Sequence, residues 1–105
     1  MYSTEPLRET LKQKGTHGPA RNITVGSTDL NTGHFRTFNE SLGADIVEAV
    51  MCSAAPPLYF PPQSFQDTYW ADGDCILNLD VFGAVERCMD VVGDESLVIV
   101  DMIFC

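Results

Sequence analysis

Residues 53–62 read SAAPPLYFPP, and residues 69–74 read YWADGD. Two adjacent prolines end any helix that precedes them, because proline donates no backbone hydrogen bond and disfavours helix in the residue before it. The short apolar run before Asp72 predicts a strand over residues 68–71. We expect Gly73 to permit a sharp turn after this strand, since glycine tolerates dihedrals that other residues avoid. The pattern presents the Asp72 carboxylate at a strand end, where catalytic bases are often found.

Helices are predicted on both sides of this segment. Apolar residues recur at helical spacing from Ile46 onward, which predicts a helix over residues 43–53 that ends at the two prolines. Beyond the strand, Asn78 or Asp80 can cap a helix that runs to about residue 92, and Gly93 is a suitable stop. Its inward-facing side chains should be those of Val81, Val85, Cys88 and Met89.

The chain should begin with a short helix. Ser3 or Thr4 can cap it, and Pro6 suits its first turn. We expect this helix to stop near Gly15, where a loop over residues 15–22 begins.

Two strands should follow this loop and pair with each other. Residues 23–28 alternate apolar with small polar residues, and residues 34–38 alternate enough to pair back with them. Between them, Asp29 should hold a turn by accepting hydrogen bonds from backbone amides. His17 and His34 have no partner motif, so we expect solvated or structural roles for them.

The C-terminal run is almost unbroken in apolar residues. Residues 97–104 read LVIVDMIF, which predicts a strand buried on both faces. Strands and helices in this order indicate an α/β layered fold. Because a chain that ends on such a strand leaves little to cover it, we expect residues 1–105 to be the C-terminal part of a larger domain.

Charge is distributed unevenly along the 105 residues. Residues 1–39 carry five Lys or Arg against three Asp or Glu, and residues 40–105 carry one against twelve. The formal net charge of -9 repels phosphate backbones and anionic headgroups at long range. We therefore expect no nucleic-acid partner, and any membrane contact should be apolar or local.

The four cysteines form no Cys-x-x-Cys pair and no cluster with histidine. We interpret Cys52, Cys75, Cys88 and Cys105 as reduced and mostly buried thiols. The N-terminus lacks the features of a signal peptide, and no run of eighteen apolar residues occurs. These observations favour a cytoplasmic location, with contact at the periphery of membranes left open.

Four short motifs stand in a distinctive order along the chain. They are TDLNTG at residues 28–33, CSAAP at 52–56, YFPP at 59–62, and the pair Asp72-Gly73 followed by Asn78. In this order they resemble the C-terminal half of patatin-like phospholipases. The resemblance covers roughly residues 20–90, and its strength lies in four separate motifs in the order that the family has.

The resemblance implies a three-layer α/β fold and a lipid acyl hydrolase, a phospholipase or esterase of lipid degradation, with a Ser-Asp dyad. In such a dyad a carboxylate within hydrogen-bond reach takes the serine proton, and backbone amides stabilise the oxyanion. Asp72 matches the catalytic aspartate of the family. Gly73 would permit its turn, and Asn78 would help to brace the start of the following helix. The implied partner is a lipid acyl ester, with peripheral contact to a membrane or lipid droplet compatible with it.

The sequence departs from the family pattern in two respects. Asp74 occupies a position that is usually small, and like charges raise a carboxyl pKa, so Asp74 either points away or makes Asp72 more basic. In addition, no serine lies in a G-x-S-x-G elbow, and no Gly-rich oxyanion loop is present. The chain thus supplies the aspartate without the nucleophile, either as part of a hydrolase or as an inactive pseudoenzyme or a fragment that contacts lipid or protein.

Other interpretations of the same residues stay open. Asp72-Gly73 can be a simple turn, and Asp72-Gly73-Asp74 has the form of a phosphoryl-transfer pair that binds Mg²⁺, although Cys75 does not suit that motif. We expect no metal and no cofactor. Ser53, at a helix end before proline, should be a structural hydroxyl. The nearby aromatic residues can line an acyl pocket or cover the core. They are Tyr59, Phe60, Phe65, Tyr69 and Trp70.

Overall fold

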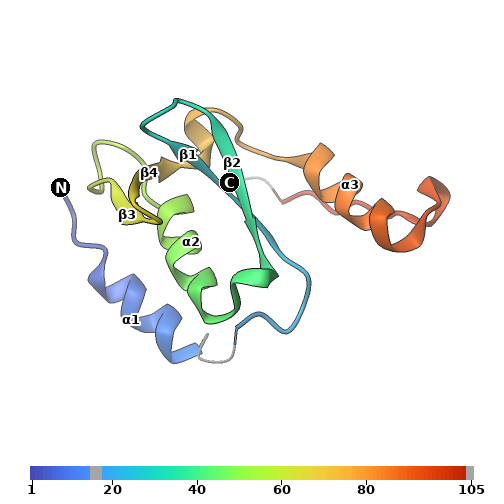
Figure 1. Ribbon diagram of the computed structural model, residues 1–105, viewed down its shortest axis with the longest axis horizontal. Coiled ribbons are helices and arrows are strands. Elements are labelled where there is room, and N and C mark those ends of the chain that lie inside the picture. Colours follow the sequence, from blue (N-terminus) through green and yellow to red (C-terminus); the bar gives the residue numbers. More distant parts are fainter. Residues whose placement is uncertain (15–17, 104–105) are drawn as a thin grey trace.

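The computed structural model describes residues 1–14 and 18–103. Four strands form one antiparallel sheet in the order β2-β1-β4-β3. Their bounds are Thr24–Asp29 for β1, Phe35–Asn39 for β2, Gln63–Phe65 for β3 and Thr68–Asp72 for β4. Figure 1 shows that β1 and β4 lie at the centre of this sheet, so the strand that ends at Asp72 is paired on both sides.

Three α-helices accompany the sheet, and the fold is mixed α/β as predicted. They are α1 at Glu5–Lys14, α2 at Ile46–Ser53 and α3 at Val81–Val92, with 3-10 turns η1 at Glu40–Asp45, η2 at Gly73–Cys75 and η3 at Glu95–Leu97. Helix α2 packs against the sheet and α1 packs against α2, whereas α3 extends away from the sheet (Figure 1).

The core lies between α2 and the sheet. Val25 of β1 meets Ile46 and Ala49 of α2, all of them buried. Trp70 of β4 packs edge-on against Phe38 of β2 with ring centroids 4.9 Å apart, so the strands on either side of β1 share one apolar layer. Burial of this layer supplies the hydrophobic free energy that holds α2 to the strand bearing Asp72.

The ends of the helices agree with the capping residues in the sequence. Before α1, Ser3 Oγ accepts a hydrogen bond from the Glu5 amide at 3.3 Å. Of the two caps proposed for α3, Asp80 is the one observed, because its carboxylate accepts a hydrogen bond from the Gly83 amide at 2.9 Å. Gly93 ends α3 with a left-handed φ of 67°, as predicted.

Strand β3 is not among the strands predicted from the sequence. It pairs with β4 through a two-residue turn in which Gln66 and Asp67 have positive φ values of 51° and 58°. Two-residue hairpin turns are usually predicted from the dipeptides Asn-Gly or Asp-Gly. The turn here is Gln-Asp, so the sequence did not indicate a hairpin.

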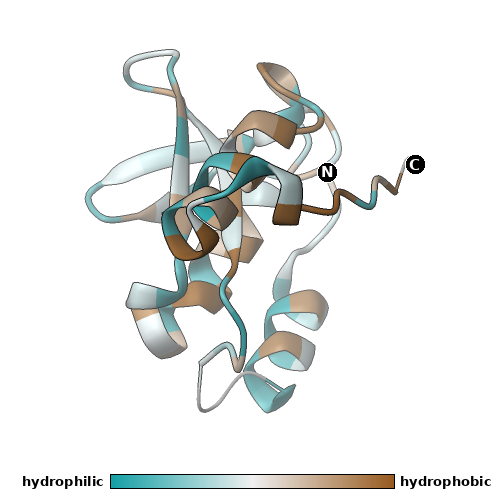
Figure 2. Cartoon of the chain, turned by 90° about the vertical axis from the view of Figure 1, so that its right-hand side faces the viewer, coloured by the Kyte–Doolittle hydropathy of each residue, from teal (hydrophilic) through white to brown (hydrophobic). Residues whose placement is uncertain are grey.

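The prediction of a doubly buried strand at residues 97–104 is wrong. Residues 95–97 form η3, and the chain then runs extended but outside the sheet, with Ile99 and Ile103 exposed. Figure 2 shows hydrophobic colours along this terminal segment, which is not covered by the sheet. A strand buried on both faces needs a partner strand and two covering layers, and the part of the chain described here places none beside it. Phe104 lies outside the described residues.

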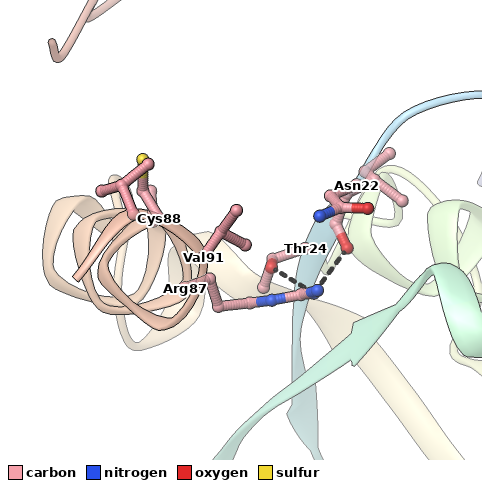
Figure 3. A pocket seen from close by; sticks show the side chains of 8 residues that line it. Asn22, Thr24, Arg87, Cys88 and Val91 are labelled. Atoms are coloured by element: carbon pink, nitrogen blue, oxygen red, sulfur yellow. Dashed lines mark hydrogen bonds between the residues drawn. The ribbon is translucent and has the colours of Figure 1, made fainter. Parts of the chain in front are cut away.

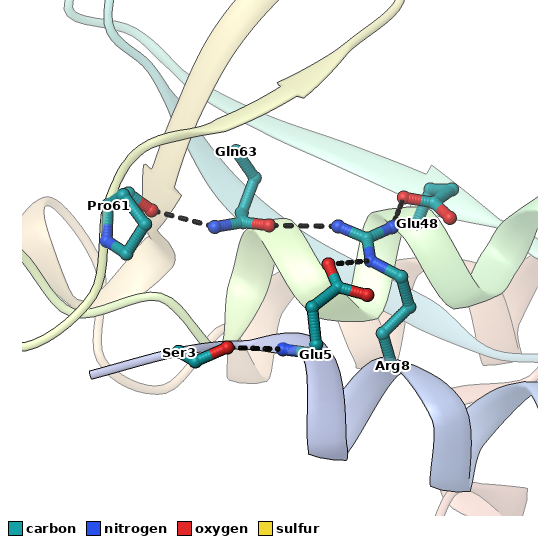
Figure 4. A network of polar contacts seen from close by, with 6 residues as sticks. All are labelled: Ser3, Glu5, Arg8, Glu48, Pro61 and Gln63. Atoms are coloured by element: carbon teal, nitrogen blue, oxygen red, sulfur yellow. Dashed lines mark hydrogen bonds and ion pairs between the residues drawn. The ribbon is translucent and has the colours of Figure 1, made fainter.

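Polar contacts attach α1, which buries none of its residues. The Arg8 guanidinium bonds to Glu48 of α2 and, at 3.1 Å, to Gln63 Oε1 of β3. Gln63 in turn donates to the Pro61 carbonyl at 2.7 Å (Figure 4). This network therefore ties residues 56–62, which we call the proline loop, to α1 and α2.

A single arginine links α3 to the sheet. Arg87 donates to the Ile23 carbonyl at 3.0 Å and to Thr24 Oγ1 at 3.1 Å, and it pairs with Glu40. Figure 3 shows this side chain reaching across a cavity of about 390 Å³ between α3 and the start of β1. The four apolar side chains expected to face inward are only half-buried: Val81, Val85, Cys88 and Met89.

The cysteines are less buried than predicted. Cys52, Cys75 and Cys88 are free thiols, but Cys75 is exposed and Cys88 half-buried. Burial raises the pKa of the Cys52 thiol to about 12, which makes it unreactive. Cys105, His17, the predicted helix stop at Gly15 and the first residues of the following loop lie outside the described residues.

Replacing Glu40 with Gln should destabilise the fold near neutral pH but not in strong acid. The hydrogen bond from Arg87 lowers the pKa of Glu40 from 4.5 to about 2. A lowered pKa in the folded state stabilises the fold above the unfolded-state pKa, and this contribution disappears as pH falls through the folded-state pKa. Urea unfolding of both proteins at about pH 6 and about pH 2 should show the difference only at the higher pH.

The exposed Glu86 of α3 offers a matched control for this experiment. Glu86→Gln should change the unfolding midpoint little at either pH, because surface substitutions without strong partners have small effects. An equal loss for Glu40→Gln at both pH values would contradict the assigned ion pair.

Candidate functional site

Asp72 stands at the C-terminal end of β4 and is held through its backbone. Its amide donates to the Ala55 carbonyl, just beyond α2, at 3.1 Å. Its carbonyl accepts a hydrogen bond from Thr28 Oγ1 of β1 at 2.9 Å. The segment SAAPP and the strand TVGSTD therefore clamp Asp72 from two sides, which the sequence alone did not indicate.

The carboxylate of Asp72 is half-buried and caps η2. Its Oδ1 accepts a hydrogen bond from the Asp74 amide at 2.9 Å. Burial raises the pKa of the Asp72 carboxyl, the Asp74 amide opposes the rise, and the charge of the exposed Asp74 adds to it. Of the two predicted effects of Asp74, an increase in the basicity of Asp72 is thus present, although desolvation contributes more to it.

Gly73 is needed for space rather than for an unusual dihedral. The expectation that glycine serves here through dihedrals that other residues avoid is wrong, since Gly73 does not have a positive φ. Instead, a Cβ at this position would lie 2.8 Å from the Gly26 carbonyl oxygen and 3.2 Å from the Phe35 ring. The turn after Asp72 therefore packs directly against the backbone of β1.

Ser27 lies opposite Asp72 in the antiparallel register of β1 and β4. Directly opposed residues project to the same face of a sheet, with Cβ atoms about 5 Å apart. Ser27 is 0% exposed, and its Oγ has no hydrogen-bond partner among the described residues. No motif drew attention to Ser27, because only the strand register brings it to Asp72.

Asp29 holds the turn after β1, as predicted. Its Oδ1 accepts hydrogen bonds from the amides of Asn31 at 2.9 Å and Thr32 at 3.3 Å. Desolvation opposes ionisation of Asp29, but these bonds, together with Arg36 at 3.6 Å, lower the pKa of its carboxyl overall. The TDLNTG segment is thus a structural turn that follows the strand beside Asp72.

The remaining predicted site residues are dispersed. Asn78 lies exposed between η2 and α3, and Asp80 provides the cap. Ser53 is the last residue of α2 and is half-buried. Within residues 1–14 and 18–103, no three His, Cys, Asp or Glu side chains are grouped so that they could hold a metal ion.

The five aromatic residues near Asp72 lie in three different environments. Trp70 and Phe65 pack against Phe38 in the core. Phe60 helps to line an apolar cavity of about 200 Å³, whereas Tyr59 and Tyr69 are exposed. Ala55 and Ala71, next to the backbone of Asp72, also line this cavity.

Replacing Asp72 with Asn should stabilise the isolated chain more at neutral pH than in acid. A raised folded-state pKa means that the fold tolerates the neutral carboxyl and is penalised once the group ionises as pH rises. Asn removes this charge, and its side-chain oxygen can still accept a hydrogen bond from the Asp74 amide. Chemical unfolding should show a larger free energy of unfolding for Asp72→Asn at about pH 7 than at about pH 3.5. An equal increase at both pH values would contradict burial as the cause of the raised pKa.

Replacing Gly73 with Ala should destabilise the fold, because the new Cβ meets the backbone of Gly26 rather than a flexible side chain. Overpacking of this kind costs about 1–3 kcal/mol. The exposed neighbour offers a control, since Asp74→Ala should shift stability by only about 0.5 kcal/mol. Equal urea midpoints for Gly73→Ala and the parent chain would refute the close packing.

Among the described residues, no helix has the length and apolar character that crossing a membrane requires.

Comparison with known proteins identifies the relatives of the chain. Residues 1–85 match the family model of the patatin-like phospholipases. Patatin-2-Kuras 2 of Solanum tuberosum is 29% identical over 103 residues, which cover 91% of this chain and 25% of that protein. The cGAMP-activated phospholipase of Escherichia coli strain TW11681 is 26% identical over 113 residues, which cover 87% of this chain and 32% of that protein.

The chain therefore spans about a quarter to a third of the length of these relatives. The resemblance drawn from the four motifs is confirmed over most of the chain. With residues 1–85 matched by the family model, this chain belongs to the patatin-like phospholipase family.

Proposed function

We propose that this chain carries the general base of a lipid acyl hydrolase and that Asp72 is this base. The observation that carries the proposal is the placement of Asp72: a half-buried carboxylate at the end of a central strand, with its backbone bonded to Thr28 and Ala55. Residues held in this way keep their side chains within narrow limits. Such precision is what proton transfer between positioned groups demands.

The environment of Asp72 suits a base that must take a proton from an alcohol. Burial raises the pKa of Asp72, and a base is most effective when its pKa approaches the working pH. The hydrogen bond from the Asp74 amide partly opposes this rise, whereas the negative charge of the exposed Asp74 carboxylate adds to it. The raised pKa thus fits acid-base work better than a purely structural turn.

In the proposed reaction Asp72 accepts the proton of a serine hydroxyl while the serine oxygen attacks the ester carbonyl carbon. The tetrahedral intermediate then expels the alcohol, which takes the proton back from Asp72, and an acyl-serine remains. Water, deprotonated by Asp72, next attacks the acyl carbon. The bond from this carbon to the serine oxygen then breaks, Asp72 returns the proton to the serine oxygen, and the fatty acid leaves. This scheme needs a serine elbow and an oxyanion loop, and the 105 residues contain no G-x-S-x-G.

Family membership supports lipid esters as the substrate class. Both relatives named above are about three to four times as long as the region that this chain matches, so each contains long segments outside the match. We infer that the serine elbow and oxyanion loop are supplied by a segment outside these residues.

The proposal predicts a large loss of activity when Asp72 is replaced. The residues should be joined to an upstream segment that carries a Gly-rich loop and a G-x-S-x-G elbow, and ester release measured from a phospholipid and a short chromogenic ester. Asp72→Asn should lower kcat by about 10²- to 10⁴-fold, the usual contribution of a general base. Asp74→Asn, which keeps the backbone amide, should cost about tenfold or less.

Two outcomes would contradict the assignment. An unchanged rate in Asp72→Asn would show that Asp72 is not the base. Ester hydrolysis by the isolated 105-residue chain would show that the nucleophile lies within this chain and not in another segment. A joined protein that folds, binds lipid and shows no hydrolysis would instead favour the pseudoenzyme.

A further inference from the structure

An exposed apolar patch lies on the surface around the proline loop. We call it the Leu58 patch, and it consists of Met1, Tyr2, Leu30, Leu58, Tyr59 and Tyr69, all of them large and exposed. These residues come from the N-terminus, the turn after β1, the proline loop and β4. Their gathering is therefore a product of the fold and not of local sequence.

Hydrogen bonds and a shared cavity show that the patch is continuous. The Tyr2 amide donates to the Tyr59 carbonyl at 2.7 Å, and the Leu30 amide donates to the Tyr69 carbonyl at 2.9 Å. Between these two links, Leu30 and Leu58 line the same apolar cavity of about 200 Å³. Half of the patch residues, Met1, Leu30 and Leu58, thus line a cavity whose other lining residues are also apolar.

Leu58 is held outward in an unfavourable backbone conformation. Its φ is 78°, which is rare for a residue with a branched side chain, and its side chain is 88% exposed. The amides of Tyr59 and Phe60 bond to the Pro56 carbonyl at 3.3 and 3.1 Å and fix this turn. Strain of this kind persists only where the surrounding structure imposes it, and it is concentrated at functional sites.

The segment that bears Leu58 is free of charge. Residues 49–66 contain no Asp, Glu, Lys, Arg or His, although the chain carries 21 charged side chains in 105 residues. The chain as a whole has a formal net charge of -9. The part of the patch that comes from the proline loop is therefore an uncharged apolar area on an acidic molecule, which suits an uncharged apolar partner better than an ionic one.

All three tyrosines of the chain lie in the patch. Tyrosine has an apolar ring and a polar hydroxyl, so it is favoured at the boundary between lipid and water. The tryptophan, by contrast, is buried in the core. A highly exposed leucine in a patch that also contains three tyrosines matches the layered polarity of a bilayer surface.

We propose that the Leu58 patch docks on the surface of a zwitterionic lipid bilayer, with Leu58 entering the acyl region. The net charge of -9 argues against anionic headgroups, and it also argues against a second copy of the same acidic chain. The proposal does not depend on hydrolysis, because binding by the patch requires neither Asp72 nor a nucleophile.

The test is cosedimentation of the 105-residue chain with vesicles of pure phosphatidylcholine. Leu58→Glu should weaken the partition coefficient about tenfold or more, the effect expected when one leucine no longer enters an apolar phase. Leu58→Gly should weaken it similarly while raising thermal stability, since glycine accepts the positive φ. This second variant separates loss of binding from loss of folding.

Ile99 provides a matched control, because its side chain is 89% exposed and lies outside the patch. Ile99→Glu should change the partition coefficient less than about twofold, and raising the salt concentration should change it little. Asp72→Asn should bind the vesicles as the parent chain does. This last variant keeps the docking test apart from the test of the catalytic proposal.

Four results would overturn the inference. They are absence of binding at millimolar lipid, equal losses in Leu58→Glu and Ile99→Glu, binding that requires phosphatidylserine, and a dimer in sedimentation equilibrium that Leu58→Glu dissociates. The last result would identify a second copy as the occupant of the patch. Loss of catalysis in Asp72→Asn with unchanged vesicle binding would leave the docking surface intact.

Discussion

The pairing of β1 with β4 is the constraint on which the rest of the structure depends. It places Ser27, Thr28 and Asp29 opposite Asp72, Ala71 and Trp70 across more than forty positions of sequence. Through it the core tryptophan reaches α2, and the Asp72 backbone meets Thr28. The absence of a side chain on Gly73 lets the turn after β4 approach the backbone of Gly26 closely, and the absence of one on Gly26 leaves room for the Phe35 ring. One register thus determines both the packing of the core and the position of the candidate base.

This arrangement places opposing demands on Asp72. Burial favours the neutral carboxyl and reduces the stability of the ionised form, yet the same burial makes the group a stronger base. The orphaned hydroxyl of Ser27 on the opposite strand is a second unfavourable feature at the same point. A buried carboxylate next to a buried hydroxyl without a hydrogen-bond partner lowers the stability of the fold, and such unfavourable pairs are typical of functional sites.

The periphery of the molecule is held by charge more than by apolar contact. Helix α1 is attached through Arg8 and helix α3 through Arg87, each bonded to a glutamate and to a second acceptor. Apolar side chains remain exposed in the Leu58 patch, in α1, between η2 and α3, on α3 itself and in the segment that follows it. Among the described residues, the Leu58 patch differs from these in having an exposed apolar residue with positive φ beside an apolar cavity.

Local chemistry determined much of the secondary structure. Proline pairs, capping residues and Gly93 set the helix ends. Alternation located β1 and β2, and a short apolar run located β4, because these signals act over a few residues. The order of four motifs also identified the family and pointed to Asp72. The Asp29 turn was readable for the same reason, since an Asx turn is local.

Only the tertiary structure decided the contacts that cross the sheet. The hairpin at Gln66-Asp67 has no sequence signal, and the apolar run at residues 97–103 read as a buried strand although no partner strand receives it among the described residues. Likewise, a side chain at position 73 is excluded by the backbone of Gly26, which lies 47 positions earlier in the sequence. The Leu58 patch forms because the fold brings four separate segments together. Sequence patterns report what a residue prefers, whereas register and packing depend on which distant residues come to lie beside it.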